Sequence, residues 1–277
     1  QKKYNNGKID PILSHYASNE KVELQEVTLH TRDILAKQIV GIKRRFPNYK
    51  AFADAPFEHV LTEKEQENAT ILTAHTFQSS ILYHTENGFE LKQLPRAAQI
   101  APIYGTLVED VDMDGYMDIL LTGNHYAGET IHGQHDALSG LLLRGNENNE
   151  FITLSNAKSG LNLTKDQRSL TKILLDNQPM FVAAANGGKT QLLKANNDIQ
   201  NNSFTFFYQP KNDDLYALIE YKNGKTAKHE FYWGNAYLGQ SSRRLMINST
   251  MERVWIYGKE GQKRLLYSKE KRKNHEQ

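Results

Sequence analysis

The sequence predicts a mainly β chain, with a helical insertion at about residues 30–70 and a β module near its C-terminal end. Most of the chain consists of short apolar or alternating runs bounded by the turn-forming residues Gly, Asn and Asp. One stretch shows helical periodicity instead, and two pairs of segments repeat each other. The expected strands are residues 80–84, 117–122, 140–144, 172–175, 180–184, 191–194, 204–208, 216–221, 229–233 and 253–257.

The helical insertion is predicted from apolar residues that recur every three to four positions and would share one face of a helix. These residues are Ile34, Leu35, Ile39, Ile42 and Phe46. Pro47 ends that helix, and a short second helix is expected around residues 49–53, before Pro56. Thr62 and Glu65 have the spacing of a capping box, which predicts a third helix running to about residue 70.

Two tight turns are predicted from their glycines. Asn223 and Gly224 lie between two alternating runs. Asn-Gly favours a two-residue type I′ hairpin, because both central residues of that turn need a positive φ. Residues 186–189, Asn-Gly-Gly-Lys, predict a second hairpin turn between two short strands.

Composition limits the class of protein and partner. The chain has 277 residues, of which 39% are apolar and 24% charged, and its formal net charge is +2. So small a net charge predicts neither nucleic acid nor an anionic membrane as a partner. No apolar run approaches the roughly 18 residues of a membrane helix, so direct membrane insertion is not expected. The absence of cysteine excludes disulfides and thiolate metal sites, and residues 268–277 predict a solvated charged tail.

Weak internal repeats predict how the strands are organised. Residues 6–13 parallel residues 114–121, and residues 81–89 parallel residues 141–151. Each copy of the second pair has a strand, a turn, an aromatic residue and another strand. Repeated strand pairs of this kind are typical of the blades of a β-propeller with long insertions, and predict a propeller or part of one.

One acidic loop carries a specific chemical signal. Its carboxylates occupy positions 1, 3, 5 and 9 of a nine-residue stretch, as Asp110, Asp112, Asp114 and Asp118. Gly115 permits a sharp turn, and the backbone carbonyl of Tyr116 can supply a further oxygen. Calcium takes about six to eight oxygen ligands, so these five residues predict a structural calcium site. Leu121 stands where an EF-hand needs its Glu, so the loop is expected to lead into a strand.

Two alternatives remain open around this loop. The first is an acidic surface turn that binds no metal. The second concerns a nearby polar stretch that could bind a transition metal or perform acid–base chemistry. Its candidate ligands are His125, Glu129, His132, His135 and Asp136. No predicted helix or hairpin fixes these side chains, so the sequence favours a polar loop over a metal site.

Aromatic residues are enriched in the C-terminal third. They are Tyr232, Trp233, Tyr237, Trp255 and Tyr257. Aromatic faces on a β surface can stack against sugar rings or anchor a protein partner. The alternative, which we expect to be more common, is that these side chains fill a core.

The acidic loop and the strand after it, residues 110–121, resemble the FG-GAP (VCBS-type) repeat of integrin-like β-propellers. Residues 45–58, 124–126 and 136–151 also resemble the C-terminal part of large FG-GAP proteins, many of them surface proteins of Bacteroidetes. Residues 220–225, 232–243 and 252–261 resemble the ASPIC/UnbV module, which commonly follows FG-GAP repeats. The resemblance implies FG-GAP-like blades with the helical insertion over residues 1–200, an ASPIC/UnbV-like module over 201–267, and the tail over 268–277.

The resemblance also implies a function. We expect a non-catalytic, calcium-binding module that binds a glycan or protein partner and packs against upstream repeats of the parent chain. Its expected location is extracytoplasmic, at the cell surface, outer membrane or periplasm. Two alternatives are a propeller-type enzyme that processes polysaccharides and a purely structural cap of a longer propeller, because fold alone does not decide activity.

Overall fold

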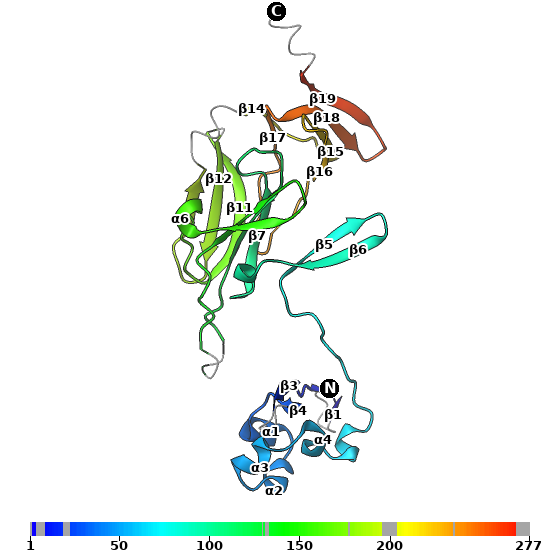
Figure 1. Ribbon diagram of the computed structural model, residues 1–277, viewed down its shortest axis with the longest axis vertical. Helices are drawn as coiled ribbons and strands as arrows, with labels where there is room; N and C mark the ends of the chain where they lie inside the picture. The colour runs from blue at the N-terminus through cyan, green and yellow to red at the C-terminus, as the bar shows by residue number, and fades with distance from the viewer. Residues whose placement is uncertain are drawn as a thin grey trace, which may run out of the picture. The chain divides into compact units, whose positions relative to one another are not determined.

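The computed structural model describes residues 2–3, 9–18, 23–128, 130, 133–176, 178–195, 204–234 and 236–269 (Figure 1). Strands make up 43% of the described residues and helices 13%, so the predicted mainly β class is confirmed. All strand pairs are antiparallel, and within the described ranges no sheet closes on itself. Contacts divide the chain into two compact units, residues 1–77 and 78–277. The domain boundary expected near residue 200 stays a prediction.

The first unit contains two small sheets and five short helices. Its strands pair as β1–β2 and β3–β4, and are β1 (Lys2–Lys3), β2 (Ile9–Asp10), β3 (Ser14–Ser18) and β4 (Leu24–Thr28). Its helices are α1 (Arg32–Gln38), α2 (Ile42–Arg45), α3 (Tyr49–Ala53), α4 (Phe57–Val60) and α5 (Glu63–Gln66). All five lie within the segment that the sequence predicts to be helical.

The predicted apolar helix face forms the core of this unit, but two helices replace the one expected. The buried core residues are Leu35, Ile39, Ile42, Phe46, Phe52, Val60 and Leu61. Ile39 has extended backbone, with φ −125° and ψ 98°, and ends α1, while α2 begins after Gly41. The chain thus leaves the helical conformation at Ile39, while Gly41 keeps helical backbone, with φ −63° and ψ −19°, and caps α2. Ile34 is the exception to the predicted face, at 36% exposed.

The capping box predicted for the third helix is present in α5. The N–H of Glu65 donates to Thr62 Oγ1 at 3.3 Å, and the N–H of Thr62 donates to Glu65 Oε2 at 2.8 Å. The Glu65 carboxylate also pairs with Arg45 of α2 at 2.9 Å, which ties the two helices together. The helix ends at Gln66, earlier than predicted.

The second unit begins with nine strands in three sheets, ordered β5-β6, β10-β9-β8-β7 and β11-β12-β13. The strands are β5 (Ser80–Thr85), β6 (Gly88–Gln93), β7 (Ile103–Glu109), β8 (Asp118–Gly123), β9 (Leu141–Gly145), β10 (Phe151–Leu154), β11 (Gln167–Leu175), β12 (Gln178–Ala185) and β13 (Gln191–Lys194). The 3-10 helix η1 (Arg96–Ala98) and the short helix α6 (Asn156–Ser159) connect them. Both longer repeat segments form hairpins, β5–β6 and β9–β10.

Strand β8 is the centre of this packing, since all six of its residues are buried. Successive side chains of a strand point to opposite faces, so β8 serves two hydrophobic clusters. Ile119 and Leu121 pack in one cluster, and Leu120 packs in the other with Leu170 of β11. The close approach of β7 to β11 also explains Gly105, where an added Cβ would lie 2.9 Å from the Leu170 side chain.

The C-terminal strands form a β module of two sheets, ordered β14-β17 and β16-β15-β18-β19. They are β14 (Phe204–Tyr208), β15 (Asp214–Tyr221), β16 (Thr226–Glu230), β17 (Leu245–Asn248), β18 (Met251–Gly258) and β19 (Lys263–Ser268). Their buried side chains form one core, made of Ala217, Ile219, Tyr221, Phe231, Leu245, Ile247, Met251, Val254 and Ile256.

The two predicted hairpin turns are present, one of them with a different turn. In the β15–β16 hairpin only Gly224 has a positive φ, 82°, and the Tyr221 N–H donates to the Lys225 carbonyl. This is a three-residue loop with a left-handed glycine, so the expected type I′ turn is wrong. β16 also ends at Glu230, short of the predicted residue 233. Between β12 and β13, Gly187 has a φ of 64° and supports the second turn.

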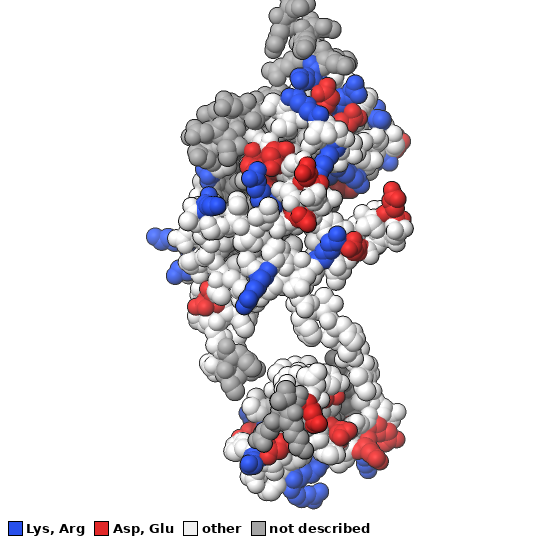
Figure 2. Space-filling view, viewed as in Figure 1, with Lys and Arg blue, Asp and Glu red and all other residues white. Residues whose placement is uncertain are grey.

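Acidic and basic side chains are interspersed on the face of the molecule drawn in Figure 2, as expected from a net charge near zero. Among the described residues no helix is both long enough and apolar enough to cross a bilayer. Residues 6–8 of the first repeat and residues 270–277 of the charged tail lie outside the described residues.

Candidate metal centre

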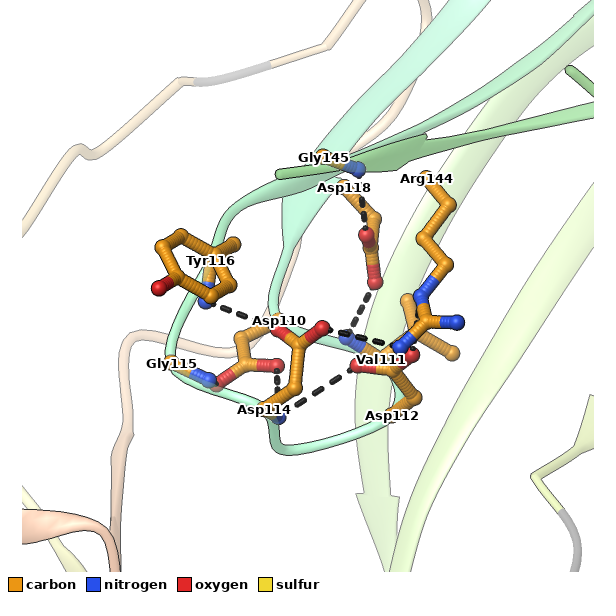
Figure 3. A network of polar contacts seen from close by, with 9 residues as sticks. All are labelled: Asp110, Val111, Asp112, Asp114, Gly115, Tyr116, Asp118, Arg144 and Gly145. Carbon is orange, nitrogen blue, oxygen red and sulfur yellow. Dashed lines mark hydrogen bonds and ion pairs between the residues drawn. The ribbon is translucent and has the colours of Figure 1, made fainter. Parts of the chain in front are cut away.

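The acidic loop occupies residues 110–117 and connects β7 to β8, directly after Glu109 and before Asp118. Two residues with positive φ, Met113 at 61° and Gly115 at 90°, bend the backbone back on itself. The sharp turn brings the aspartates of the loop together (Figure 3). The strand predicted after the loop is β8, so this part of the prediction is confirmed.

The loop carboxylates accept hydrogen bonds from the loop's own backbone. Asp110 accepts from the N–H groups of Asp114 at 3.1 Å and Gly115 at 3.0 Å. Asp112 also accepts from the Asp114 N–H at 3.3 Å, and Asp114 Oδ1 accepts from the Tyr116 N–H at 2.9 Å. These bonds turn alternate side chains inward, which is the arrangement that the one-residue gaps in the sequence predict.

Asp118 joins the loop to two strands. Its carboxylate accepts from the Val111 N–H and from the Gly145 N–H of β9, both at 2.9 Å, and the residue is only 1% exposed. A Cβ at position 145 would lie 2.2 Å from the Met117 carbonyl oxygen, so only glycine lets β9 approach this closely. The Asp118 carboxylate, at the ninth position of the motif, is therefore held in place by strand β9 as well as by the loop.

Three of the four aspartates have the geometry of a shared metal site. Oxygen atoms of Asp110, Asp112 and Asp118 all lie within 4.8 Å of one another. Calcium–oxygen distances are about 2.3–2.6 Å, so two ligands on opposite sides of one ion are roughly 5 Å apart. The cluster therefore fits calcium, with carbonyl oxygens or waters completing the shell. The predicted ligand role of the Tyr116 carbonyl stays a prediction.

Asp114 lies outside this group and faces Arg144, a residue that the sequence does not connect with the loop. Arg144 of β9 pairs through Nε with Asp112 at 2.7 Å and through Nη2 with Asp114 at 3.0 Å (Figure 3). Among the described residues this guanidinium is the one cation that pairs with the four aspartates, and it pairs with two of them, so most of the negative charge is uncompensated when all four are ionised. The arginine therefore neutralises part of the charge of Asp112 and Asp114.

Burial makes ionisation of the cluster unfavourable. It raises the pKa of Asp110 to about 7; the Gly115 N–H opposes this shift, and the neighbouring carboxylates add to it. The pKa values of Asp112 and Asp118 are raised too, again mainly by burial. A bound divalent cation would reverse this balance, because it favours the charged form of every carboxylate around it.

The histidine stretch forms a polar network of its own. His125 and His135 pair through their backbones in an antiparallel bridge, with N···O distances of 2.8 and 2.9 Å. His125 Nδ1 lies 3.1 Å from Arg168 Nη2 and 3.3 Å from the Tyr104 hydroxyl. Asp136 is exposed. Two of the candidate ligands, Glu129 and His132, lie outside the described residues.

The aromatic residues of the C-terminal third divide into two groups. Tyr232, Trp233 and Tyr237 are 57%, 69% and 54% exposed, so the expectation that they fill a core is wrong for them. They lie in the connection after β16, where no strand turns them inward. Trp255 and Tyr257 of β18 are half-buried, with the Trp255 Nε1–H donating to Glu220 at 3.0 Å.

In the described part of the chain, Asp110, Asp112 and Asp118 are the only group of three or more His, Asp or Glu side chains close enough to share one metal. The site therefore depends on an acidic loop, a buried strand and the neighbouring strand β9. Comparison with known proteins adds no relative: no model of a protein family matches the chain, and no curated protein matches it.

Proposed function

We propose that this chain is a calcium-stabilised, non-catalytic binding and scaffolding module that acts outside the cytoplasm and binds a glycan or protein partner. The observation that carries the proposal is the placement of oxygens from Asp110, Asp112 and Asp118 within 4.8 Å of one another. A loop that gains folding energy from calcium needs a calcium concentration high enough to keep the site occupied, which supports a location outside the cytoplasm.

The sheet that holds the loop supports a relationship with FG-GAP blades. β7, β8, β9 and β10 are hydrogen-bonded in sequence order, an antiparallel meander of four strands. A propeller blade has this topology, and the FG-GAP resemblance implies a calcium loop between blade strands. We therefore propose that residues 103–154 are one FG-GAP-like blade, and that β14–β19 correspond to the ASPIC/UnbV-like module.

The acidic loop also contacts the C-terminal β module, which gives a bound ion a scaffolding role. A Cβ at Gly115 would lie 3.4 Å from Asn223 Nδ2 in the β15–β16 hairpin. From the same hairpin, Lys225 Nζ lies 4.3 Å from the centre of the Tyr116 ring and donates to the Glu147 carbonyl at 2.9 Å. Calcium would therefore stiffen a loop on which the sheet and the module meet.

Thermal unfolding with and without calcium tests this proposal. A ligand that binds only the folded chain stabilises it by about 2.7 kcal/mol at a hundredfold excess over Kd. We expect millimolar calcium to raise the Tm of the wild type by a few degrees above its value in EDTA. Asp112→Asn should lose this increase. Asp136→Asn, which neutralises an exposed aspartate outside the cluster, should keep it.

Isothermal titration of the same proteins with calcium chloride decides between a metal site and an acidic turn. A calcium-dependent signal in the wild type and in Asp136→Asn, absent from Asp112→Asn, supports the site. If the wild type shows neither binding nor a Tm shift, the loop is a metal-free turn held by Arg144, and the proposal fails.

A further inference from the structure

A cavity of about 430 Å³ lies within residues 78–277, between the main sheets and the C-terminal β module. Its walls include Glu109 of β7 and Lys172 of β11 on one side, and β16 with the segment 241–244 on the other. This volume is in the range of small-molecule sites, about 300–1,000 Å³. Met117, the last residue of the acidic loop, lines the cavity, but none of the four aspartates does, so the cavity is separate from the candidate metal ligands.

Two arginines give the cavity an uncompensated positive charge. Arg243 and Arg244 line it, both are half-buried, and neither pairs with a carboxylate among the described residues. Arg243 donates from Nε to the Phe231 carbonyl at 3.1 Å and from Nη2 to the Asp214 carbonyl at 3.5 Å, and Arg244 donates from Nε to Gln209 at 2.7 Å. A guanidinium has five N–H donors, so each arginine keeps donors that have no partner among the described residues.

The other charged side chains of the cavity neutralise one another. Lys172 pairs with Glu109 at 2.5 Å, and Lys228 pairs with Glu230. His229 also lines the cavity, and burial lowers its pKa, so its ring is neutral near pH 7. The net charge that a ligand meets therefore comes from the two arginines, and it selects an anion.

Exposed aromatic side chains adjoin these arginines. Tyr232 lines the cavity although it is 57% exposed, so it lies at the opening. The guanidinium of Arg243 covers one face of the Trp233 ring, 3.7 Å from its centre, and Trp233, which lies outside the cavity lining, is 69% exposed. An exposed aromatic ring offers an apolar face for a ligand that carries flat hydrophobic surface, which a bare inorganic anion lacks.

We propose that this cavity binds a carboxylate-bearing sugar, a uronate unit of an acidic glycan. The carboxylate is bound by Arg243 and Arg244, in the bidentate manner that guanidinium groups favour. The sugar ring packs against Tyr232 at the opening and reaches the exposed ring of Trp233 outside the cavity, and the neutral ring of His229 offers a hydrogen bond to a hydroxyl. This inference rests on the proposed binding function and names the class of its ligand.

A matched pair of disaccharides tests the proposal. Cellobiouronic acid and cellobiose differ only in one carboxylate, so titration calorimetry with both isolates the charged contact. We expect the acid to bind the wild type at least about tenfold more tightly, a difference of about 1.4 kcal/mol, because the carboxylate forms charge-assisted hydrogen bonds that cellobiose cannot form. Arg244→Gln and Trp233→Ala should each weaken binding of the acid by about tenfold or more, while Arg96→Gln, an exposed arginine elsewhere, should not.

Sodium sulfate is the third probe, and it separates a sugar site from a simple anion site. Equal binding of cellobiose and the acid would overturn the proposal. So would sulfate binding of equal strength that Trp233→Ala leaves unchanged, or no binding of the acid by a wild type that melts cooperatively. The calcium-dependent Tm shift of the same samples is independent of these outcomes, so a failure of this site is distinct from a failure of the calcium site.

Discussion

The four aspartates of the loop differ in their surroundings, and this decides which of them tests metal binding. Asp118 is 1% exposed and holds backbone groups of two segments, so its substitution would also disturb the sheet. Asp114 faces Arg144 and lies outside the group of three. Asp112 combines a place in that group with partial exposure, so it is the position where loss of the metal is least confused with loss of the fold.

Arg144 pairs with two of these carboxylates, so under the proposed calcium binding it would compete with the ion, and its removal should have opposite effects in the metal-free and calcium-bound states. Without metal, Arg144→Gln takes away the counter-charge of Asp112 and Asp114 and should lower the Tm. With millimolar calcium the ion supplies that charge, so the calcium-induced rise in Tm should be larger than in the wild type. Differential scanning fluorimetry in EDTA and calcium measures both, with Arg96→Gln as control. An unchanged calcium shift would show that Arg144 does not compete.

The raised pKa of Asp110, about 7, predicts an unusual pH dependence. Between about pH 4 and 7 the metal-free folded chain holds a proton at Asp110 that the unfolded chain has released. The free energy of unfolding in EDTA should therefore decrease as the pH rises through this window, and Asp110→Asn should make this decrease smaller.

A calcium ion that binds Asp110 must displace that proton, so the apparent affinity of the chain for calcium should rise by about tenfold per pH unit towards pH 7. Urea unfolding and calcium titrations at several pH values check both slopes.

At the scale of elements, strand β9 completes the site, because its residues Arg144 and Gly145 both contact the acidic loop. Gly145→Ala should destabilise the chain by about 2 kcal/mol or more, since the new Cβ would lie 2.2 Å from the Met117 carbonyl oxygen and push β9 away from Asp118. Gly234→Ala is the matched control, because a Cβ there meets no atom within 4 Å. Urea unfolding measures the free energy of unfolding of both variants. Equal values would contradict the close approach of β9 to the Met117 carbonyl.

The elements and the contacts between them were not equally predictable from the sequence. The acidic residues, the glycine turn and the strand after them are local in sequence, so spacing alone predicts the loop. Arg144 lies beside the acidic loop because β9 pairs with β8, and no pattern in the sequence around the loop predicts this pairing. The break in the predicted helix at Ile39 and the exposure of Trp233 are likewise not recorded in the apolar periodicity, which continues through Ile39 and Ile42, or in the residue type of Trp233.

At the scale of the second unit, the acidic loop lies where the four-stranded sheet meets the C-terminal β module. Its contacts to the module come from the β15–β16 hairpin, through Asn223 and Lys225. An ordered acidic loop at this boundary would therefore also stabilise the packing of the four-stranded sheet against the C-terminal β module. Loss of the ion is then expected to loosen the hairpin as well as the loop, because low-stability segments open first.

Hydrogen exchange with and without calcium tests this link. In the wild type we expect calcium to slow exchange in residues 110–117 and also in residues 221–225, where the N–H groups of Tyr221 and Gly224 donate within the turn. Lys225→Met removes the cation from the Tyr116 ring, so it should keep the protection of the loop and lose much of that of the hairpin. Lys222→Met, in the same hairpin, should behave as the wild type. Protection confined to the loop in the wild type would mean that the ion orders its own ligands only, and the module would be held by its apolar core alone.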